Sequence, residues 1–384
     1  RQQLRALKRQ RALEKQAADR TSRKKATHAD REQRQVVWDT LPEEEQMERR
    51  NEHMSMLVPA HDLVAAPMVG ASDLAFRLLC RRHGAALTYT EMLFADHLIN
   101  DDAYRQEKLL SQLDAQDHPL CIQLAGNDAT VLASAAKLVE PHCEMIDLNL
   151  GCPQSRAQER LEGAFLCEPQ LWGRVFSIVR ALVAQVGIPI SCKIRLLESE
   201  GDHGCTDQTI EFAKGLEAAG CSLLAVHGRR RGSPSKRRQG PADLIAIKAI
   251  KAALSIPVLT NGNVRRSSDV QSAIAATGAN GAMVGEALLT YPGLLEAHAH
   301  DAPSMSARRT IAHEYCALAK AYPPPSIEYA RGHIGWMFGK QGHGKSRRFK
   351  FVRAFEARAV SEMLASATSA DELAGLVSIL MTDP

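Results

Sequence analysis

Short apolar segments of strand length alternate with segments of helical periodicity from Leu57 onward, and this alternation most constrains the fold. Eight segments read as strands: 63–68, 86–90, 120–124, 145–150, 189–194, 223–227, 258–261 and 281–284. Six read as helices: 73–82, 129–139, 170–186, 206–219, 242–253 and 268–276. Such alternation builds βαβ units around a parallel sheet. Eight units in about 250 residues close a barrel, so we predict an α/β fold, a (β/α)8 TIM barrel over residues 55–302.

A doubly wound sheet is the competing architecture. It would place a Gly-rich phosphate-binding turn after the first strand. In that position the chain has Pro67-Met68-Val69-Gly70-Ala71-Ser72, which contains a single glycine. The barrel is therefore the favoured interpretation.

Two flanking regions complete the predicted organisation. Residues 1–54 form a basic N-terminal extension, helical or disordered, without a sustained apolar stripe. Residues 303–384 are expected to form a small all-helical domain with helices at 311–321, 327–338, 349–364 and 370–382. Three consecutive prolines, Pro323 to Pro325, separate the first two of these helices.

Charge is distributed unevenly, although the net charge of the chain is only +4. Residues 1–34 carry 12 Lys or Arg and four Asp or Glu, and residues 331–358 carry eight Lys or Arg against Glu356 alone. A third basic run contains Arg229, Arg230, Arg231, Lys236, Arg237 and Arg238. Any single block could be solvated surface or a disordered tail. Three blocks, one of them interleaved with aromatic residues, favour a polyanionic partner.

Composition excludes several classes of protein. Apolar residues make up 45% and charged residues 24%, which is ordinary for a globular chain. No apolar run approaches the length of a bilayer span, and the Arg-rich start lacks the apolar core of a secretory signal, so no membrane association is expected. The nine cysteines include no C-x-x-C pair, so neither a metal site nor a disulfide framework is predicted.

Polar residues and glycines recur where the predicted strands end. In a barrel the carboxyl ends of the strands carry the functional site. The ends supply the following residues: Pro67, Met68, Thr90, Glu91, Gln123, Asn149, Gly151, Cys152, Pro153, Lys193, Arg195, His227, Arg229, Asn261, Gly262, Asn263, Gly285 and Glu286. Turn formation and capping could explain one or two of them, but not a recurrence at most strands.

Two of these ends favour a phosphate-bearing cofactor. Asn261-Gly262-Asn263 follows the seventh predicted strand and Gly285-Glu286 follows the eighth. Glycines there let backbone N–H groups approach a phosphate. Each pair alone could be an ordinary turn, so the signal lies in their joint position.

Three further strand-end side chains suit a planar ring. A cation such as Lys193 beside the N1–C2 edge of a flavin stabilises the negative charge of the reduced form. Gln123 offers an amide donor and an acceptor to a ring edge. His227 ends the sixth strand, where the alternative is a satisfied core histidine, and for Lys193 the alternative is a surface lysine.

Cys152 differs from the other cysteines in its position. It directly follows a predicted strand and is flanked by Gly151 and Pro153. A thiol on a loop above a cofactor can act as a general acid. The other eight cysteines are most simply small hydrophobic residues.

Six motifs in order resemble the dihydrouridine synthases, flavin enzymes that reduce uridines in tRNA. The motifs are Val64-Ala65-Ala66-Pro67-Met68-Val69, Asp147-Leu148-Asn149-Leu150-Gly151-Cys152-Pro153-Gln154, Gly163-Ala164-Phe165-Leu166, Cys192-Lys193-Ile194-Arg195, Val226-His227-Gly228-Arg229, and Ile256-Pro257-Val258 through Asn261-Gly262-Asn263. The resemblance covers about residues 60–300 and is strongest to the eukaryotic branch acting at positions 16 and 17 of the D loop. Tyr322-Pro323-Pro324-Pro325 and Arg331-Gly332-His333 resemble the family's tRNA-facing tail.

The resemblance implies FMN as cofactor, NADPH or NADH as reductant and transient partner, and tRNA as substrate. The cofactor-binding residues would be Pro67, Met68, Val69, Gln123, Lys193, His227, Asn261, Gly262, Asn263, Gly285 and Glu286. The substrate would contact Asn149, Arg195, Arg229 and Arg331. Hydride would pass from flavin N5 to C6 of a flipped uridine, and Cys152 would protonate C5. A monomer in the cytoplasm or nucleus is expected, with an organelle left open.

One segment departs from the family pattern. After Cys-Pro-Gln the relatives commonly have a basic residue, a glycine and an aromatic, where this chain has Glu159, Arg160, Leu161 and Glu162. This segment motivates one alternative, a catalytically weak or inactive member that binds RNA or assists assembly. A second alternative is a flavin barrel that reduces a small pyrimidine, and such an enzyme would have no need of the basic blocks.

Overall fold

The computed structural model describes residues 62–197, 204–232, 240–296, 303–338 and 365–379, with the short segments 340–341 and 348–349 and scattered positions between Pro42 and Leu57. Most of the N-terminal extension, the run Lys236-Arg237-Arg238 and most of the basic block 331–358 lie outside the described residues. Contacts divide the chain into two units, Arg1–Gln46 and Met47–Pro384. All that follows concerns the second unit.

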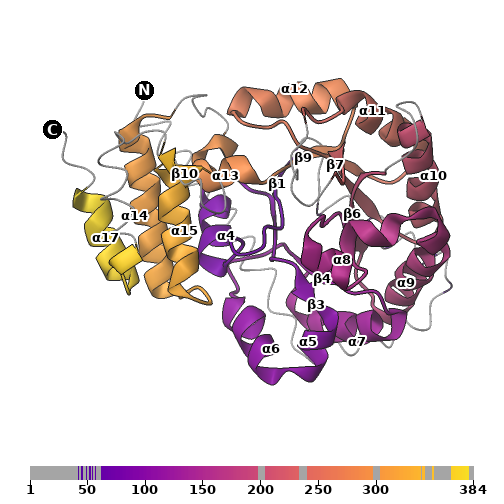
Figure 1. The fold of residues 1–384 in the computed structure, drawn as a ribbon, viewed down its shortest axis with the longest axis horizontal. Helices are drawn as coiled ribbons and strands as arrows, with labels where there is room; N and C mark the ends of the chain where they lie inside the picture. The colour runs from indigo at the N-terminus through magenta and orange to yellow at the C-terminus, as the bar shows by residue number, and fades with distance from the viewer. Residues whose placement is uncertain are drawn as a thin grey trace. The chain divides into compact units, whose positions relative to one another are not determined.

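Eight parallel strands form a closed barrel, as the sequence predicts (Figure 1). They are β1 (Asp62–Ala65), β2 (Leu87–Tyr89), β4 (Leu120–Ala125), β5 (Met145–Leu150), β6 (Ile190–Leu196), β7 (Leu223–Arg230), β8 (Val258–Asn261) and β9 (Gly281–Val284). Closure comes from β1, which pairs in parallel with both β2 and β9. A two-residue strand, β3 (Leu93–Phe94), adds to the end of β4.

Helices follow most of the strands and cover the outside of the barrel (Figure 1). In chain order they are α4 (Leu74–Arg82), α5 (Ala95–Asn100), α6 (Asp102–Lys108), α7 (Ala129–Val139), α8 (Ser155–Glu159), α9 (Trp172–Gln185), α10 (Gly204–Ala218), α11 (Leu244–Ala253), α12 (Ser267–Thr277) and α13 (Glu286–Thr290). Asp73, Asp128 and Asp243 cap α4, α7 and α11 by accepting hydrogen bonds from first-turn N–H groups. Such caps satisfy donors that the helix itself leaves free.

The lower barrel interior is filled with side chains and is not a pore. One buried cluster contains Met54, Leu57, Val64, Ala66, Leu87, Tyr89, Cys121, Met145, Leu223, Ala225, Leu259 and Met283. Met54 and Leu57, which precede the first strand, are only 0% and 7% exposed. Burying a large apolar side chain contributes about 1.5–3 kcal/mol, so these two residues belong energetically to the barrel.

Three helices follow the barrel: α14 (Met305–Ala321), α15 (Ile327–Met337) and α17 (Ala370–Ile379). Their apolar residues share a buried cluster with α4 and α13, including Phe76, Tyr315 and Ile334. His333 lies inside it, stacked on Phe76 at 4.3 Å between ring centroids, with its Nε2 2.7 Å from the Asp73 carboxylate. These helices are thus packed against the barrel's own helices.

Among the described residues of the tail, one segment differs from the expected all-helical pattern. Phe349, expected to begin a helix, lies instead in β11 (Arg348–Phe349), which pairs antiparallel with β10 (Lys340–Gln341). Gly342 and Gly344 lie between the two strands in the sequence. The rest of the predicted helix 349–364 lies outside the described residues.

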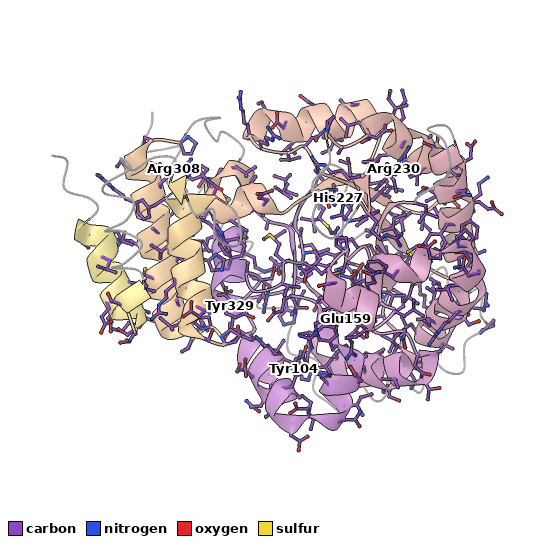
Figure 2. The ribbon with its side chains drawn as sticks, viewed as in Figure 1. Tyr104, Glu159, His227, Arg230, Arg308 and Tyr329 are labelled. Carbon is purple, nitrogen blue, oxygen red and sulfur yellow. The ribbon has the colours of Figure 1, made fainter. Side chains whose placement is uncertain are left out.

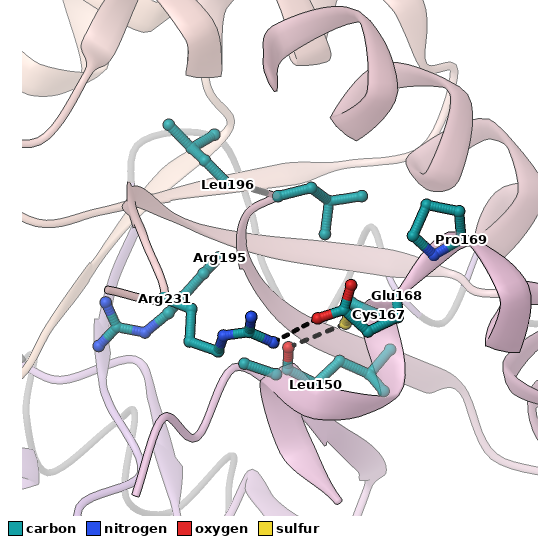
Figure 3. Close-up of a pocket in the computed structure, with 9 residues that line it drawn as sticks. Leu150, Cys167, Glu168, Pro169, Arg195, Leu196 and Arg231 are labelled. Carbon is teal, nitrogen blue, oxygen red and sulfur yellow. Dashed lines mark hydrogen bonds and ion pairs between the residues drawn. The ribbon is translucent and has the colours of Figure 1, made fainter. Parts of the chain in front are cut away.

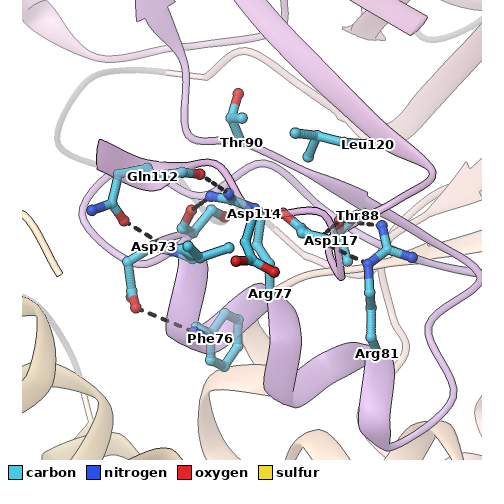
Figure 4. Close-up of polar contacts among 12 residues, drawn as sticks. Asp73, Phe76, Arg77, Arg81, Thr88, Thr90, Gln112, Asp114, Asp117 and Leu120 are labelled. Atoms are coloured by element: carbon cyan, nitrogen blue, oxygen red, sulfur yellow. Dashed lines mark hydrogen bonds and ion pairs between the residues drawn. The ribbon is translucent and has the colours of Figure 1, made fainter. Parts of the chain in front are cut away.

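A buried ion cluster ties α4 to the segment before β4 (Figure 4). The Asp117 carboxylate accepts hydrogen bonds from Arg77 Nε at 2.6 Å, from Arg81 Nε at 2.8 Å and from the Thr88 hydroxyl at 2.8 Å. Burial alone would raise the pKa of Asp117, but the charges of Arg77 and Arg81 outweigh it and lower that pKa below its ordinary value. The carboxylate is therefore stabilised in its charged form.

Replacing Asp117 by asparagine is expected to cost about 3–5 kcal/mol of unfolding free energy at pH 7, because two buried guanidinium groups lose their counter-charge. Since the folded-state pKa is depressed, the aspartate's contribution is present above the unfolded pKa and is lost as pH falls through the folded pKa. Urea unfolding at pH 7 and near pH 3 measures both effects. Asp371→Asn, which breaks an exposed pair with Lys320, is the control and should change little. Equal effects of the two variants would contradict the assignment.

Candidate active site

A buried hydrogen-bond chain crosses the barrel toward Cys152. The Ser191 hydroxyl and Gln123 Nε2 donate to the two oxygens of the Asp147 carboxylate at 2.6 and 2.7 Å. Asn149 Nδ2 donates to Gln123 Oε1 at 2.8 Å, and the Asn149 amide oxygen accepts from the backbone N–H of Cys152 at 3.0 Å. A carboxylate can only accept, so Asp147 fixes the orientation of Gln123, and Gln123 fixes that of Asn149.

The outcome for two predicted residues follows from this chain. Asn149, expected to contact the substrate, accepts hydrogen bonds from the backbone N–H groups of Gly151 and Cys152, and its substrate contact stays a prediction. Gln123, expected to bind a cofactor ring, has both ends of its amide engaged within the barrel. Its ring contact stays a prediction. Sequence reasoning missed Asp147 as the residue that orients them, although it precedes Asn149 by two positions and faces the same side of the strand.

Lys193 lies on β6, in register with Asn149 on β5. Burial, reinforced by the nearby charge of Arg195, lowers the pKa of Lys193 to about 8. Within the described residues its ammonium has no hydrogen-bond or ion-pair partner. Asp147 and Cys152 in their ionised forms both favour the charged lysine. The barrel thus holds a cation that its own side chains do not neutralise by direct contact.

Asp147 is the corresponding buried acid. Its carboxylate has no solvent exposure, and burial raises the pKa of Asp147 to about 6. Hydrogen bonds from Ser191 and Gln123, and the charge of Lys193, counteract that rise. The pKa of the Asp147 carboxyl is thus raised, and the pKa of the nearby Lys193 ammonium is lowered. Opposite pKa shifts of this kind in one site are typical of functional positions and also occur in structural ion networks.

Arg195, at the end of β6, forms hydrogen bonds with two neighbouring segments. Arg195 Nε donates to the Gly151 carbonyl at 2.9 Å, and its guanidinium also reaches the Arg230 carbonyl at 3.3 Å. Burial, followed by the charge of Arg229, lowers the pKa of Arg195 to about 10. Arg195 therefore joins the Cys152 loop to the end of β7, and its predicted contact with a substrate stays a prediction.

Arg229 makes its contacts on the opposite side of β7. Its guanidinium donates to His227 Nε2 at 2.9 Å and to Asn263 Oδ1 at 3.0 Å. Because arginine can only donate, Nε2 of His227 is the unprotonated nitrogen and Nδ1 carries the hydrogen. Burial, together with the charges of Lys193, Arg195 and Arg229, holds the pKa of His227 well below its ordinary value. His227, labelled with Arg230 in Figure 2, is thus neutral at pH 7.

The turn after β8, where a phosphate contact is predicted, has left-handed backbone at two positions. Gly262 and Asn263 have positive φ values of 113° and 63°. The Asn263 side chain exchanges two hydrogen bonds with the backbone of Ala242, at 2.7 and 3.0 Å. Asn261 donates to the Met283 carbonyl at 2.7 Å, which joins β8 to β9. The three residues therefore form a rigid turn.

A hollow of about 460 Å³ opens beside this turn, lined by Gly240, Pro241, Asn263, Arg265, Arg266 and Asp269. The backbone N–H groups of Arg265 and Arg266 already donate to Asp269 Oδ2. An anion here would thus be held by the two guanidinium groups rather than by those N–H groups. Sequence reasoning missed both arginines, although they follow Asn263 after a single valine.

Substituting Gly262 by alanine is expected to cost about 1–3 kcal/mol of unfolding free energy. The left-handed φ already disfavours alanine, and the added Cβ would lie 2.8 Å from Ala242 Cβ. Gly173→Ala in α9 is the matched control, since nothing lies within 4 Å of its added Cβ, and it should stabilise slightly. Urea unfolding measures both. A Gly262→Ala variant as stable as the parent would remove the case for a rigid turn.

The first and last strand ends meet at the closure of the barrel. A Cβ on Gly285 would lie 3.4 Å from Ala66 Cβ and 3.6 Å from Met68 Sδ. Pro67, Met68 and Val69 therefore follow β1 beside the end of β9, and Val69 is 51% exposed. Glu286 begins α13 directly after Gly285. The structure thus brings the predicted ring-lining residues close to one of the predicted phosphate-end residues.

Cys152 lies on the loop after β5, and the segment Gly163–Ala164 approaches it closely. Gly163 has φ of +61°, and a Cβ there would lie 2.8 Å from the Cys152 carbonyl oxygen. The Ala164 N–H donates to that carbonyl at 3.1 Å. Among the cysteines whose side chains the structure describes, seven are buried and Cys152 alone is partly exposed. This supports singling it out.

The segment that departs from the family pattern is held by an ion network. Arg160 lies between Asp96 at 2.8 Å and Glu162 at 2.9 Å, and its guanidinium stacks over Phe94. Glu162 is only 2% exposed, and burial raises the pKa of its carboxyl. Leu161 between them has a positive φ of 50°. The unusual residues therefore form a defined loop.

A second cavity, of about 20 Å³, lies between Leu150, Cys167 and Arg195 (Figure 3). Arg231 closes one side by donating to Glu168 Oε1 at 2.6 Å. Such a volume holds about one water molecule, so this cavity cannot receive a base. Arg331 lies elsewhere, on α15, where it donates to the Ala367 carbonyl at 2.9 Å, and no described contact brings it to the strand ends.

Comparison with known proteins gives a consistent result. A family model described as dihydrouridine synthase (Dus) matches residues 63–371. A Rattus norvegicus protein named tRNA-dihydrouridine(16/17) synthase, NAD(P)(+)-like, is 40% identical over 275 residues, covering 71% of this chain and 58% of the relative. The tRNA-dihydrouridine synthase B of Pseudomonas putida is 32% identical over 302 residues, covering 76% and 86%. The chain thus spans little more than half of the rat relative.

Within the described residues no helix is long and apolar enough to cross a membrane. Among those described residues, no group of three or more His, Cys, Asp or Glu side chains is placed to hold a metal ion. The match to the family model extends over the barrel and over α14 and α15, well beyond half of the sequence. This chain therefore belongs to the dihydrouridine synthase family.

Proposed function

We propose that this chain reduces uridine to 5,6-dihydrouridine in tRNA, at positions 16 and 17 of the D loop, with FMN as bound cofactor and NADPH or NADH as reductant. The observation that carries the proposal is the conjunction of Lys193, a half-buried cation without a hydrogen-bond or ion-pair partner among the described residues, with the partly exposed thiol of Cys152 at the same strand ends. The rat relative's name contains the same positions and NAD(P)(+).

The residues present fit FMN at two places. Lys193 supplies a cation for the electron-rich edge of the ring. The turn at Gly262, which has no room for a Cβ, and the hollow with Arg265 and Arg266 suit a phosphate. When bound, FMN would supply the hydride that adds to C6 of the uracil ring.

The remaining steps fall to the chain's own residues. Cys152 donates its thiol proton to C5 of the uracil, and the resulting thiolate is stabilised by the charges of Lys193 and Arg195. Asn149 accepts a hydrogen bond from the Cys152 backbone N–H and so holds the loop that carries the thiol. The uridine must leave its stack in the folded tRNA to reach the strand ends. Basic residues would hold the tRNA backbone without reading its sequence.

Anaerobic stopped-flow measurements test the proposal. The purified protein is first examined for flavin absorbance, then reduced with NADPH or NADH and mixed with unmodified tRNA, with free uridine or with buffer. Fast reoxidation by tRNA alone, with dihydrouridine mapped to positions 16 and 17 by mass spectrometry, is the expected result. Equal reoxidation by free uridine would favour a reductase of small pyrimidines. Bound tRNA without faster reoxidation would favour a non-catalytic RNA-binding factor.

A further inference from the structure

Glu91 lies at a junction that the proposed chemistry does not use. It follows β2 in the segment before β3 and is 9% exposed. Its Oε2 accepts a hydrogen bond from the Gly70 backbone N–H at 2.9 Å, and its Oε1 accepts one from the Tyr329 hydroxyl at 2.7 Å. Tyr329 belongs to α15 (Figure 2). A single carboxylate thus connects the loop after β1 with the helices that follow the barrel.

The Gly70 end of this contact belongs to the loop expected to line the flavin ring. Gly70 has φ of +73° and directly follows Val69. The same loop is closed on itself, because the Ser72 N–H donates to the Met68 carbonyl at 3.0 Å and the Met68 N–H donates to the Ser72 hydroxyl at 2.9 Å. Glu91 therefore supplies the loop's anchor from outside, through a charge-assisted hydrogen bond.

Lys108 on α6 completes the junction. Its ammonium lies 2.9 Å from the Tyr329 hydroxyl, 3.6 Å from Glu91 Oε1 and 5.0 Å from the centre of the Tyr329 ring. Since ammonium can only donate, the hydroxyl accepts from Lys108 and donates to Glu91. Burial, followed by the charge of Glu91, raises the pKa of Tyr329 well above its ordinary value, so the hydroxyl keeps its proton. The direction of the contacts is therefore fixed.

We propose that Glu91 is a positioning residue through which Tyr329 of α15 sets the conformation of the Pro67–Gly70 loop, so that the C-terminal helices help to build the cofactor site. This inference rests on the proposed binding of FMN. It gives α15 a role in the cofactor site in addition to the tRNA-facing role that the resemblance implies. By linkage, FMN binding should in turn strengthen the docking of α15 on the barrel.

Tyr329→Phe in the full chain tests the proposal, because it deletes only the hydroxyl. Tyr322→Phe is the matched control, since the Tyr322 hydroxyl accepts from Gln116 Nε2 at 2.6 Å and makes no described contact with the loop after β1. The FMN dissociation constant is measured by quenching of flavin fluorescence. We expect about tenfold weaker binding for Tyr329→Phe, as for the loss of a hydrogen bond to a charged group, and no change for Tyr322→Phe.

A second readout needs no cofactor. Hydrogen exchange of the apo protein should be faster in residues 67–72 of Tyr329→Phe than of Tyr322→Phe. Glu91→Gln should weaken FMN binding and speed the exchange of residues 67–72 to about the same extent as Tyr329→Phe. The double variant should show no larger change in either quantity than each single variant. Equal FMN affinity in the two tyrosine variants would overturn the proposal, as would equal exchange. Failure of the parent protein to bind FMN would instead count against the proposed function, while the exchange comparison still decides whether Tyr329 controls the loop.

Discussion

Cys152→Ala should lower the rate of uridine reduction by about 10² to 10⁴, the range expected for loss of a general acid. The thiol is partly exposed, whereas the other cysteines with described side chains are buried. Its backbone is held by Asn149 on one side and by the Gly163–Ala164 segment on the other. No second acid is expected to take over. Single-turnover reoxidation of pre-reduced protein by unmodified tRNA, with mass spectrometry of the product, measures the effect.

Two comparisons make this result specific. Flavin absorbance should stay at the parent level, because the residues proposed to hold FMN do not include the Cys152 side chain. Cys167→Ser is the matched control from the neighbouring segment, since the buried Cys167 thiol donates to the Leu150 carbonyl and a hydroxyl can do the same. Its rate should be close to that of the parent. Full turnover in Cys152→Ala would assign the proton donor to another group.

Periodicity predicted the barrel well because each strand is bounded by strong local signals. The predicted segments 145–150 and 258–261 match β5 and β8 in full, and 129–139 matches α7. Both strands are buried along their whole length, and each begins with a short apolar stretch, Met145-Ile146 in β5 and Val258-Leu259 in β8. The carboxyl ends of parallel strands must meet at one end of the barrel, so Cys152, Lys193 and His227 could be grouped from their positions alone.

What the sequence could not show are contacts between residues distant along the chain. Glu91 and Tyr329 are separated by 238 positions and carry no motif that pairs them. Arg229 looked like a free cation for a substrate, but its contacts with His227 and Asn263 depend on how β7 and β8 pair. Met54 was placed in a polar extension, because its burial requires a closed barrel to pack against. Each case depends on tertiary geometry that local patterns do not encode.

Lys193→Met is expected to weaken FMN binding about tenfold to a hundredfold, as for the loss of a hydrogen bond from a charged donor. Methionine keeps much of the length of the side chain and removes the charge. The lysine lies in the apolar strand β6, and its ammonium has no hydrogen-bond or ion-pair partner within the described residues. The variant should therefore fold about as well as the parent, because the half-buried ammonium that it loses makes no direct contact with a counter-charge. Fluorescence quenching gives the affinity and thermal unfolding gives the stability.

The pH dependence separates an electrostatic role from a steric one. With its pKa lowered to about 8, Lys193 is charged below that pH and loses its proton as pH rises through it. FMN affinity of the parent should thus be highest below pH 8 and fall above it, whereas Lys193→Met should show a flat profile at the lower value. Lys248→Met, at an exposed position of α11, is the control and should follow the parent. A fall above pH 8 that persists in Lys193→Met would mean that another group titrates, and would remove Lys193 from the electron-rich edge of the cofactor.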